Sequence, residues 1–184
     1  MLIIPAFLTG DTITQPLRRF LDRCGFRSYG WELGVNWGPT PGILRDLASR
    51  LAQIREETGA PVNVIGISLG GLLARDLAHR APELVRHVVT VAAPVRLPTA
   101  TLLEPLFHAL APFYSRAMDL DRVSVALPVP WTAIYSKRDG ILAWESCVTA
   151  DGNGQCHAVE APHIMMARNP DALRIIVERL APPV

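Results

Sequence analysis

The sequence lacks the features that mark a membrane-spanning, a nucleic-acid-binding or a disordered protein. No apolar run reaches the roughly 18 residues of a membrane-spanning helix, so we expect a soluble protein. Lysine and arginine total 18 against 17 aspartates and glutamates, which leaves no basic excess for binding a nucleic-acid backbone. With 49% hydrophobic and 19% charged residues, the composition also excludes intrinsic disorder.

Cysteine is scarce as well. The three cysteines, Cys24, Cys147 and Cys156, match no zinc-binding spacing. Cys147 and Cys156 could pair across a short loop, but free thiols in a reducing compartment are the favoured interpretation. The N-terminus lacks the basic leader, long apolar stretch and cleavage site of a signal peptide. We therefore expect a cytoplasmic protein, unless a leader has already been removed.

What is present is an alternation of short β-branched runs and amphipathic stretches. A chain of 184 residues predicts one domain, 1–184, with a core that needs no disulfide or metal. Continuous apolar strands separated by helices predict an α/β protein whose parallel sheet is covered on both faces. The expected strands are Leu2–Ile4, Arg27–Trp31, Pro61–Ile67, Val85–Ala92, Val129–Tyr135 and Gln155–Val159.

Capping signals mark several helix ends. Thr40-Pro41 combines an N-cap residue with proline at the first helical position, and Gly59 is a suitable stop. Further helices are expected over 14–24, over 69–80 and from Asn169-Pro170 onward. The apolar spacing of the last helix predicts an inward face of Leu173, Ile176, Val177 and Leu180. Residues 95–128 interrupt the alternation, and we expect a helical insertion there.

A glycine-flanked serine stands between an expected strand and an expected helix. Gly66-Ile67-Ser68-Leu69-Gly70 fits the Gly-x-Ser-x-Gly pattern, in which a strand turns sharply into a helix and exposes the serine on a strained backbone. The helix would direct its positive end at the serine, and the Leu69 N–H could bind a developing oxyanion. Ser68 is therefore a candidate nucleophile. The alternative is a serine that only caps the helix.

A serine nucleophile needs a base, and His163 fits best among the five histidines. His163 follows the last expected strand, and loops after parallel strands gather at one edge of a sheet, beside Ser68. Asp139 follows the preceding strand and is the candidate for the carboxylate that orients the base. The chain order serine, aspartate, histidine is the hydrolase order. The alternative for Asp139-Gly140 is an ordinary turn.

A metal site is disfavoured, although four possible ligands lie close together in the sequence. In a strand, Glu160 would face away from His157 and His163. We expect packing or solvent exposure, rather than catalysis, for the remaining histidines. The possible ligands are Cys156, His157, Glu160 and His163, and the remaining histidines are His79, His87, His108 and His157.

These motifs resemble the α/β-hydrolase superfamily, and within it small lipase- and esterase-like members. The resemblance runs through nearly the whole chain. It implies a minimal α/β-hydrolase fold with about six mostly parallel strands, helices on both faces and the helical insertion at 95–128. It rests on IIPAFLTGD near the start, GISLGG around Ser68, VVTVAAPV after it, KRDGIL around Asp139 and APHIMMARNP around His163.

The resemblance also implies an activity and further site residues. The loop after the first strand would supply the second oxyanion donor. Many family members have His-Gly there; this chain reads Pro5-Ala6-Phe7, which assigns the donor to the Phe7 N–H. We expect a serine hydrolase that cleaves small-molecule or lipid carboxylic esters through an acyl-enzyme on Ser68, without a cofactor.

The insertion bears on the substrate. Leu106, Phe107 and Leu110 are expected either to bind an apolar acyl chain above Ser68 or to complete the core. Two rival functions stay open. One is an acyltransferase or thioesterase that uses the same three side chains, and the other is a non-catalytic binding protein that kept the fold.

Overall fold

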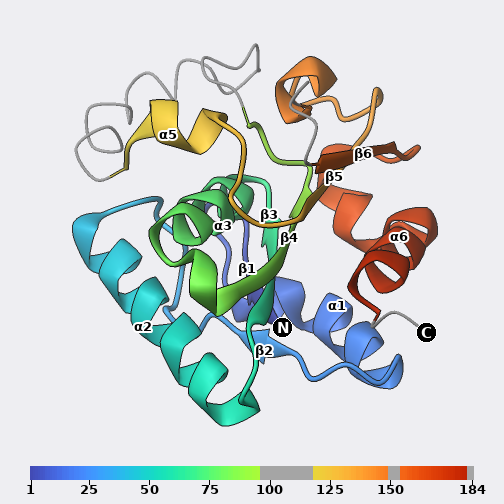
Figure 1. The fold of residues 1–184 in the computed structure, drawn as a ribbon. Helices are drawn as coiled ribbons and strands as arrows, with labels where there is room; N and C mark the ends of the chain where they lie inside the picture. The colour runs from blue at the N-terminus through green and yellow to red at the C-terminus, as the bar shows by residue number, and fades with distance from the viewer. Residues whose placement is uncertain (96–117, 149–153, 182–184) are drawn as a thin grey trace.

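Six parallel strands form one sheet in the computed structural model, which describes residues 1–95, 118–148 and 154–181 (Figure 1). The order across the sheet is β2-β1-β3-β4-β5-β6, and every neighbouring pair is parallel. The predicted parallel α/β sheet is therefore confirmed. The strands are β1 (Leu2–Ile4), β2 (Tyr29–Gly30), β3 (Val62–Ile67), β4 (Val85–Val91), β5 (Trp131–Tyr135) and β6 (Gly154–Ala158).

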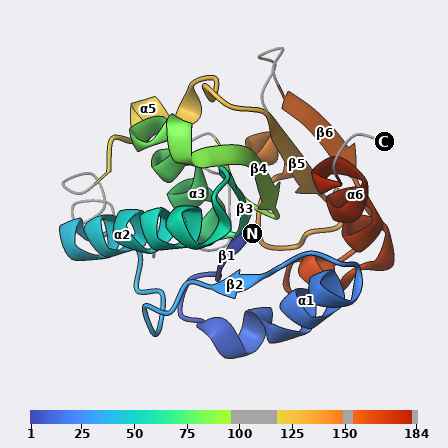
Figure 2. The same cartoon turned by 60° about the horizontal axis from the view of Figure 1, so that its bottom comes forward.

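Helices cover both faces of this sheet, as predicted (Figures 1 and 2). On one face lie α1 (Asp11–Arg23) and α6 (Pro170–Leu180). On the other face lie α2 (Pro41–Thr58) and α3 (Leu69–Arg80), and the short α5 (Leu120–Ser124) packs against α3. Within the described residues, three short 3-10 helices span Pro82–Leu84, Trp144–Cys147 and His163–Arg168.

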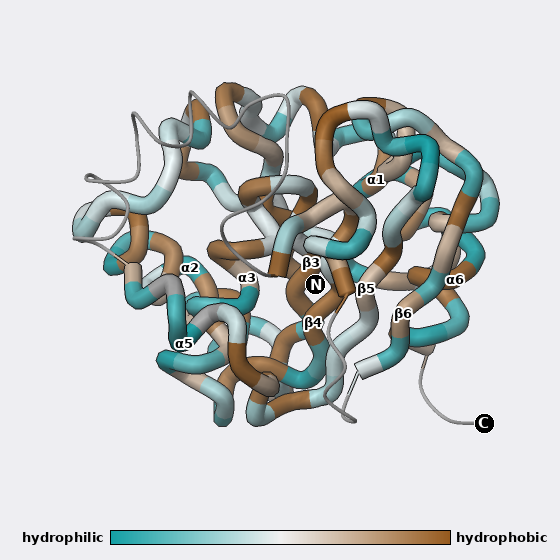
Figure 3. The backbone as a smooth tube through the Cα atoms, turned by 90° about the horizontal axis from the view of Figure 1, so that it is seen from above, coloured by the Kyte–Doolittle hydropathy of each residue, from teal (hydrophilic) through white to brown (hydrophobic). Residues whose placement is uncertain are grey.

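The strand residues divide between two hydrophobic cores because successive side chains of a strand point to opposite faces. Leu2 and Val64 pack with α2 and α3, whereas their neighbours Ile3 and Ile65 pack with α1 and α6. All four side chains are fully buried. Figure 3 shows the hydrophobic residues concentrated along the central strands β3 and β4. Burial on both faces explains why these strands read as continuous apolar runs.

The capping signals act where the sequence places them. The Thr40 side chain accepts a hydrogen bond from the Ile43 N–H, and Pro41 is the first residue of α2. Gly59 ends that helix with a φ of +68°, in the left-handed region that glycine adopts without a steric penalty. These local rules fix α2, whose inner face carries Leu47 and Leu51.

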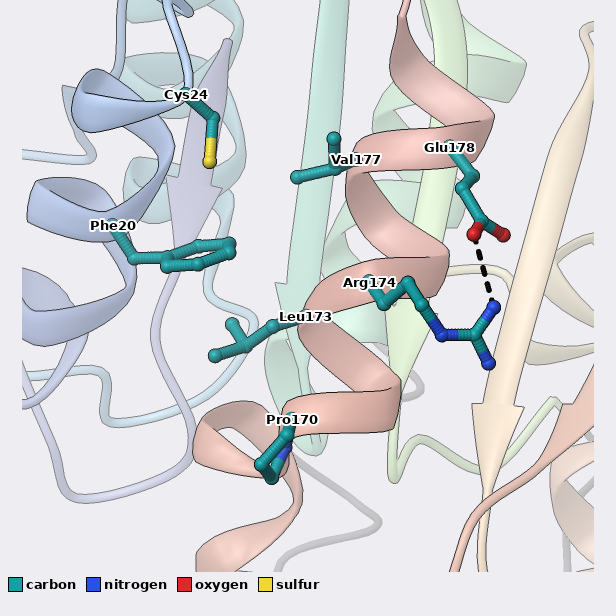
Figure 4. A pocket seen from close by; sticks show the side chains of 7 residues that line it. All are labelled: Phe20, Cys24, Pro170, Leu173, Arg174, Val177 and Glu178. Carbon is teal, nitrogen blue, oxygen red and sulfur yellow. Dashed lines mark hydrogen bonds and ion pairs between the residues drawn. The ribbon is translucent and has the colours of Figure 1, made fainter.

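The inward face of α6 differs from the prediction. Leu173 and Val177 are only half-buried, and Ile175 is buried in their place beside Ile176. Leu173 and Val177 instead line a surface hollow of about 490 Å³ between α1 and α6 (Figure 4). Its other lining residues are Phe20, Cys24, Pro170, Arg174 and Glu178.

The insertion falls mostly outside the described residues, which resume at 118. Its two described ends are anchored to the body of the fold. The Val95 N–H donates to Ser146 O at 2.7 Å, and Arg75 of α3 donates to Val125 O at 2.7 Å. Arg75 is fully buried, with its guanidinium 5.1 Å from the centre of the Trp131 ring.

Cys24, Cys147 and Cys156 form no disulfide bond, so Cys147 and Cys156 do not pair. Burial raises the pKa of the Cys147 thiol to about 12. Among the helices of the described ranges, none combines the length and the apolar character needed to cross a membrane.

Candidate active site

Ser68 lies at the point where β3 passes into α3, at the carboxyl edge of the sheet. Its φ of +52° and ψ of −122° are unusual for a residue with a side chain. The Ser68 N–H donates to Val91 O at the end of β4, at 2.8 Å, which holds the turn. The Ser68 side chain makes no capping hydrogen bond to α3. The hydroxyl is therefore used elsewhere, and the helix-capping alternative is not what the geometry shows.

Two glycines make this sharp turn possible. A β-carbon at Gly66 would lie 2.3 Å from Gly70 O, and one at Gly70 would lie 2.5 Å from Ile4 O and 2.6 Å from Pro5 O. Side chains at these positions would force backbone segments apart. The start of α3 is thus packed directly against the end of β1, which brings the loop after β1 next to Ser68.

The base candidate His163 lies between Ser68 and Asp139. His163 Nε2 is 3.0 Å from Ser68 Oγ, and His163 Nδ1 is 2.8 Å from Asp139 Oδ2 and 2.9 Å from Oδ1. An ionised carboxylate only accepts hydrogen bonds, so Nδ1 must carry a proton to bond Asp139. The tautomer with its proton on Nδ1 has Nε2 placed to accept the serine O–H. Three side chains from the loops after β3, β5 and β6 thus form one hydrogen-bonded chain.

The environment of Asp139 keeps its carboxylate ionised. Burial alone would raise its pKa, but the hydrogen bonds from His163 and from the Leu142 N–H outweigh it, and the pKa lies below its ordinary value. Asp139 Oδ1 accepts from the N–H groups of Ile141 and Leu142 at 2.9 and 2.7 Å. These bonds form the turn that an Asp-Gly pair favours, and they fix the carboxylate facing His163. The contact with His163 is what goes beyond an ordinary turn.

Sequence reasoning did not identify Ser136, which joins the loops of Asp139 and His163. Its buried hydroxyl accepts the Arg138 N–H at 3.0 Å and the Ala161 N–H at 3.3 Å. A second link is the His163 N–H, which donates to the backbone oxygen of Asp139 at 2.9 Å. No local pattern marks Ser136, because one of its partners lies 25 residues away.

The two expected oxyanion donors lie on either side of the same junction. Leu69 is the first residue of α3, so its N–H has no acceptor within the helix. Phe7 lies in the loop after β1, between Pro5, which contacts Gly70, and Leu8, whose φ is +59°. The Phe7 side chain packs against the core that contains α2 and α3.

The remaining expectations concern the acyl-binding residues and a metal site. Leu106, Phe107 and Leu110 lie outside the described residues. The hollow between α1 and α6 is not lined by Ser68, Asp139 or His163. Over the three described ranges, no group of at least three histidine, cysteine, aspartate or glutamate side chains is arranged to hold a metal ion.

A six-stranded parallel sheet with a serine, a histidine and a carboxylate joined at its carboxyl edge defines a class of protein. A family model described as the alpha/beta hydrolase fold matches residues 17–146 of the chain. The chain therefore belongs to the α/β-hydrolase fold family. The match contains Ser68 and Asp139 and ends before His163. Only the structure therefore places His163 beside these two residues.

Solved structures agree on the fold at low sequence identity. A monoacylglycerol lipase of Paleococcus ferrophilus aligns with a TM-score of 0.71 at 15% identity, covering 97% of this chain and 92% of that one. A lipase of Bacillus licheniformis aligns at 0.75 and 11% identity, with coverages of 97% and 90%. A carboxylesterase of Bacillus subtilis aligns at 0.67 and 14%, with coverages of 99% and 84%. The search of curated proteins found no match.

Proposed function

We propose that the protein is a serine hydrolase that cleaves carboxylic esters through an acyl-enzyme on Ser68. The observation that carries this proposal is the hydrogen-bonded chain from Ser68 Oγ through His163 to Asp139, with distances of 3.0 and 2.8 Å. These distances are those of a nucleophile within reach of its base and a base within reach of its orienting carboxylate.

In the proposed reaction, Ser68 Oγ attacks the ester carbonyl carbon while His163 Nε2 takes the hydroxyl proton. Asp139 stabilises the resulting imidazolium and holds the ring in its tautomer. The N–H groups of Leu69 and Phe7 bind the oxyanion of the tetrahedral intermediate. That intermediate collapses, the C–O bond to the alcohol breaks, and the alcohol leaves with the proton from His163. Water then attacks the acyl-enzyme by the same route and releases the carboxylic acid and free Ser68.

Exposed apolar side chains support an apolar ester as the substrate. Leu8, Trp37 and Ile164 follow β1, β2 and β6 on the side of the sheet where Ser68 lies, and 52%, 66% and 78% of their surfaces are exposed. Apolar surface that is open to water beside a nucleophile can bind the hydrocarbon part of a substrate. We infer that esters with longer acyl chains are preferred to acetate. Several structural neighbours are named as lipases or esterases, which agrees with this class of substrate.

The test is covalent labelling with a fluorophosphonate, followed by hydrolysis of p-nitrophenyl esters of increasing acyl length. We expect labelling at Ser68, hydrolysis that favours medium chains over acetate, and a loss of kcat of about 10⁴-fold or more in Ser68→Ala. His163→Ala should lose kcat to a similar extent, whereas His157→Ala, on the edge strand β6, serves as its matched control and should keep it.

Other outcomes would favour the rival functions. A chain that binds esters but is neither labelled nor active is a binding protein. Acyl transfer to an added alcohol that outpaces hydrolysis indicates an acyltransferase, and a clear preference for thioesters indicates a thioesterase. A preference for acetate esters would contradict the inferred apolar acyl site but not the proposed ester hydrolysis.

A further inference from the structure

Asn36, in the loop after β2, is a buried polar residue that the proposed mechanism does not use. Its side chain is 0% exposed, and buried amides are costly unless their hydrogen bonds are satisfied. Asn36 Nδ2 donates to Pro5 O at 2.7 Å, and Asn36 Oδ1 accepts the Gly38 N–H at 3.0 Å. Both polar atoms of the carboxamide are thus hydrogen-bonded. Nδ2 bonds the loop after β1, 31 residues away in sequence, and Oδ1 bonds the loop of Asn36 itself.

The backbone of Asn36 holds the same neighbouring loop. The Asn36 N–H donates to Thr9 O at 2.8 Å, and Asn36 O accepts the Leu8 N–H at 2.8 Å. Leu8 is in the left-handed region at a φ of +59°, a conformation that a residue with a side chain keeps only when its surroundings enforce it. Asn36 therefore binds Pro5, Leu8 and Thr9, the residues around Phe7. The strands that carry the two loops, β1 and β2, pair side by side (Figure 2).

These bonds determine how the Ala6–Phe7 peptide is oriented. The N–H and the side-chain hydroxyl of Thr9 both donate to Ala6 O, at 3.1 and 2.8 Å. In a trans peptide the carbonyl and the N–H point in opposite directions, so the Phe7 N–H is directed away from this turn. Asn36 holds Thr9, and the bonds from Thr9 to Ala6 O close the turn. Asn36 therefore also holds the orientation of the Phe7 N–H, which points out of this turn.

The Pro5 carbonyl connects this arrangement to Ser68. The oxygen that accepts from Asn36 Nδ2 is the one that a β-carbon at Gly70 would approach to 2.6 Å, two residues after Ser68. The Asn36 carboxamide therefore holds the loop after β1 at the point where it contacts the first turn of α3.

We propose that Asn36 is a positioning residue that sets the Phe7 N–H relative to Ser68 Oγ and so builds the second half of the oxyanion site. This inference rests on the proposed function. It goes beyond that function by assigning a role to a side chain that is bonded to the oxyanion loop and takes no part in the proton-transfer chain.

The decisive variant is Asn36→Asp, which keeps the shape and the acceptor for Gly38 but replaces the donor to Pro5 O with a carboxylate oxygen. Oxyanion bonds strengthen in the transition state, so we expect kcat to fall by about 10- to 100-fold with KM unchanged. The affinity for a boronic acid that forms a tetrahedral adduct with Ser68 should fall by the same factor.

Thr40→Ala is the matched control. It also removes one hydrogen bond between a side chain and the backbone, that of Thr40 Oγ1 with the Ile43 N–H, without touching the loop after β1. Assays at temperatures equally far below the Tm of each variant separate positioning from lost stability. Wild-type kcat and boronate affinity in Asn36→Asp would overturn the proposal, as would equal losses in Thr40→Ala.

A further measurement does not depend on activity. Amide hydrogen exchange, followed by NMR, should accelerate at Leu8 and Thr9, and the Phe7 amide resonance should shift, in Asn36→Asp but not in Thr40→Ala. Unchanged exchange and an unchanged Phe7 resonance would overturn the proposal even if the wild-type chain hydrolyses no ester. An inactive wild type with the expected NMR changes would instead contradict the proposed function and leave the positioning of the loop supported.

Discussion

The backbone at Ser68 is strained in a way that glycine would relieve. A φ of +52° with a ψ of −122° places the β-carbon where it meets the adjoining backbone, and such conformations cost roughly 1–3 kcal/mol. The turn is nonetheless enforced, because the Ser68 N–H is bonded to Val91 O and Gly66 and Gly70 pack closely on either side. The strain therefore lowers the stability of the fold at the residue proposed as the nucleophile.

A comparison of two variants measures this strain. Ser68→Ala and Ser68→Gly both remove the hydroxyl, so both should be inactive, but only glycine relaxes the backbone. We expect Ser68→Gly to be more stable than Ser68→Ala by roughly 1–3 kcal/mol in urea unfolding. Equal free energies of unfolding for the two variants would show that the serine turn is unstrained.

At the scale of elements, the site depends on how closely α3 approaches the end of β1. Gly70 lies in the first turn of α3, and the oxygens of Ile4 and Pro5 occupy the space that a side chain there would need. Backbone atoms cannot move aside as a flexible side chain can. The close approach of α3 to the end of β1 therefore sets both the packing of the helix and the distance between the two expected oxyanion donors, the N–H groups of Leu69 and Phe7.

Gly70→Ala should destabilise the fold by about 2–3 kcal/mol and lower kcat, because the helix must shift away from β1. Gly42→Ala is the matched control, since a β-carbon in the first turn of α2 would meet only Thr40 Oγ1 at 3.8 Å and Arg45 Nη2 at 4.0 Å. That variant should gain up to about 1 kcal/mol, from the helix propensity of alanine. Chemical denaturation measures the free energy of unfolding of both variants. An unchanged free energy of unfolding in Gly70→Ala would contradict the close approach of α3 to the end of β1.

The sequence predicts these elements well where local chemistry decides and poorly where packing decides. The N-cap at Thr40 and the stop at Gly59 depend only on neighbouring residues. In α6, two overlapping apolar faces fit the helical period equally, one with Leu173 and Val177 and the other with Ile175. Packing against the sheet selects the second face and leaves Leu173 and Val177 at the hollow beside α1. That packing cannot be read from the local pattern.

The site shows the same division. Ser68, Asp139 and His163 could be predicted because each follows a strand of a parallel sheet, whose carboxyl edge gathers such loops. Asn36 and Ser136 could not be predicted, because their partners are backbone groups 31 and 25 residues away and carry no side-chain signature.

For the whole molecule, the ionisation of Asp139 links the site to stability. The pKa of Asp139 is held below its ordinary value of 3.8, so the carboxylate contributes to the free energy of unfolding above that pH. The contribution is lost as the pH falls through the lower pKa of the folded state. Acidification should therefore weaken the fold in part through the same group that orients His163.

The difference in unfolding free energy between the wild type and Asp139→Asn should narrow as the pH drops below about 4, and it should be largest near neutrality. Urea unfolding between about pH 3 and pH 7 measures it. Asp46→Asn, at an exposed position on α2, serves as the control for removing a carboxylate. A difference that stays constant down to the lowest pH would contradict a stabilising Asp139 carboxylate.

The order of the chain has a consequence during synthesis. Ser68 precedes His163 by 95 residues, and β6, which carries the loop of His163, is the last strand added, at the edge of the sheet. At roughly 5–20 residues per second, a ribosome takes about 5–20 seconds to travel from one to the other. Throughout that interval the nascent polypeptide holds a hydroxyl without its imidazole. A prematurely terminated product that ends before β6 would keep Ser68 but lack His163, its proposed proton acceptor, and would also lack α6, which covers one face of the sheet.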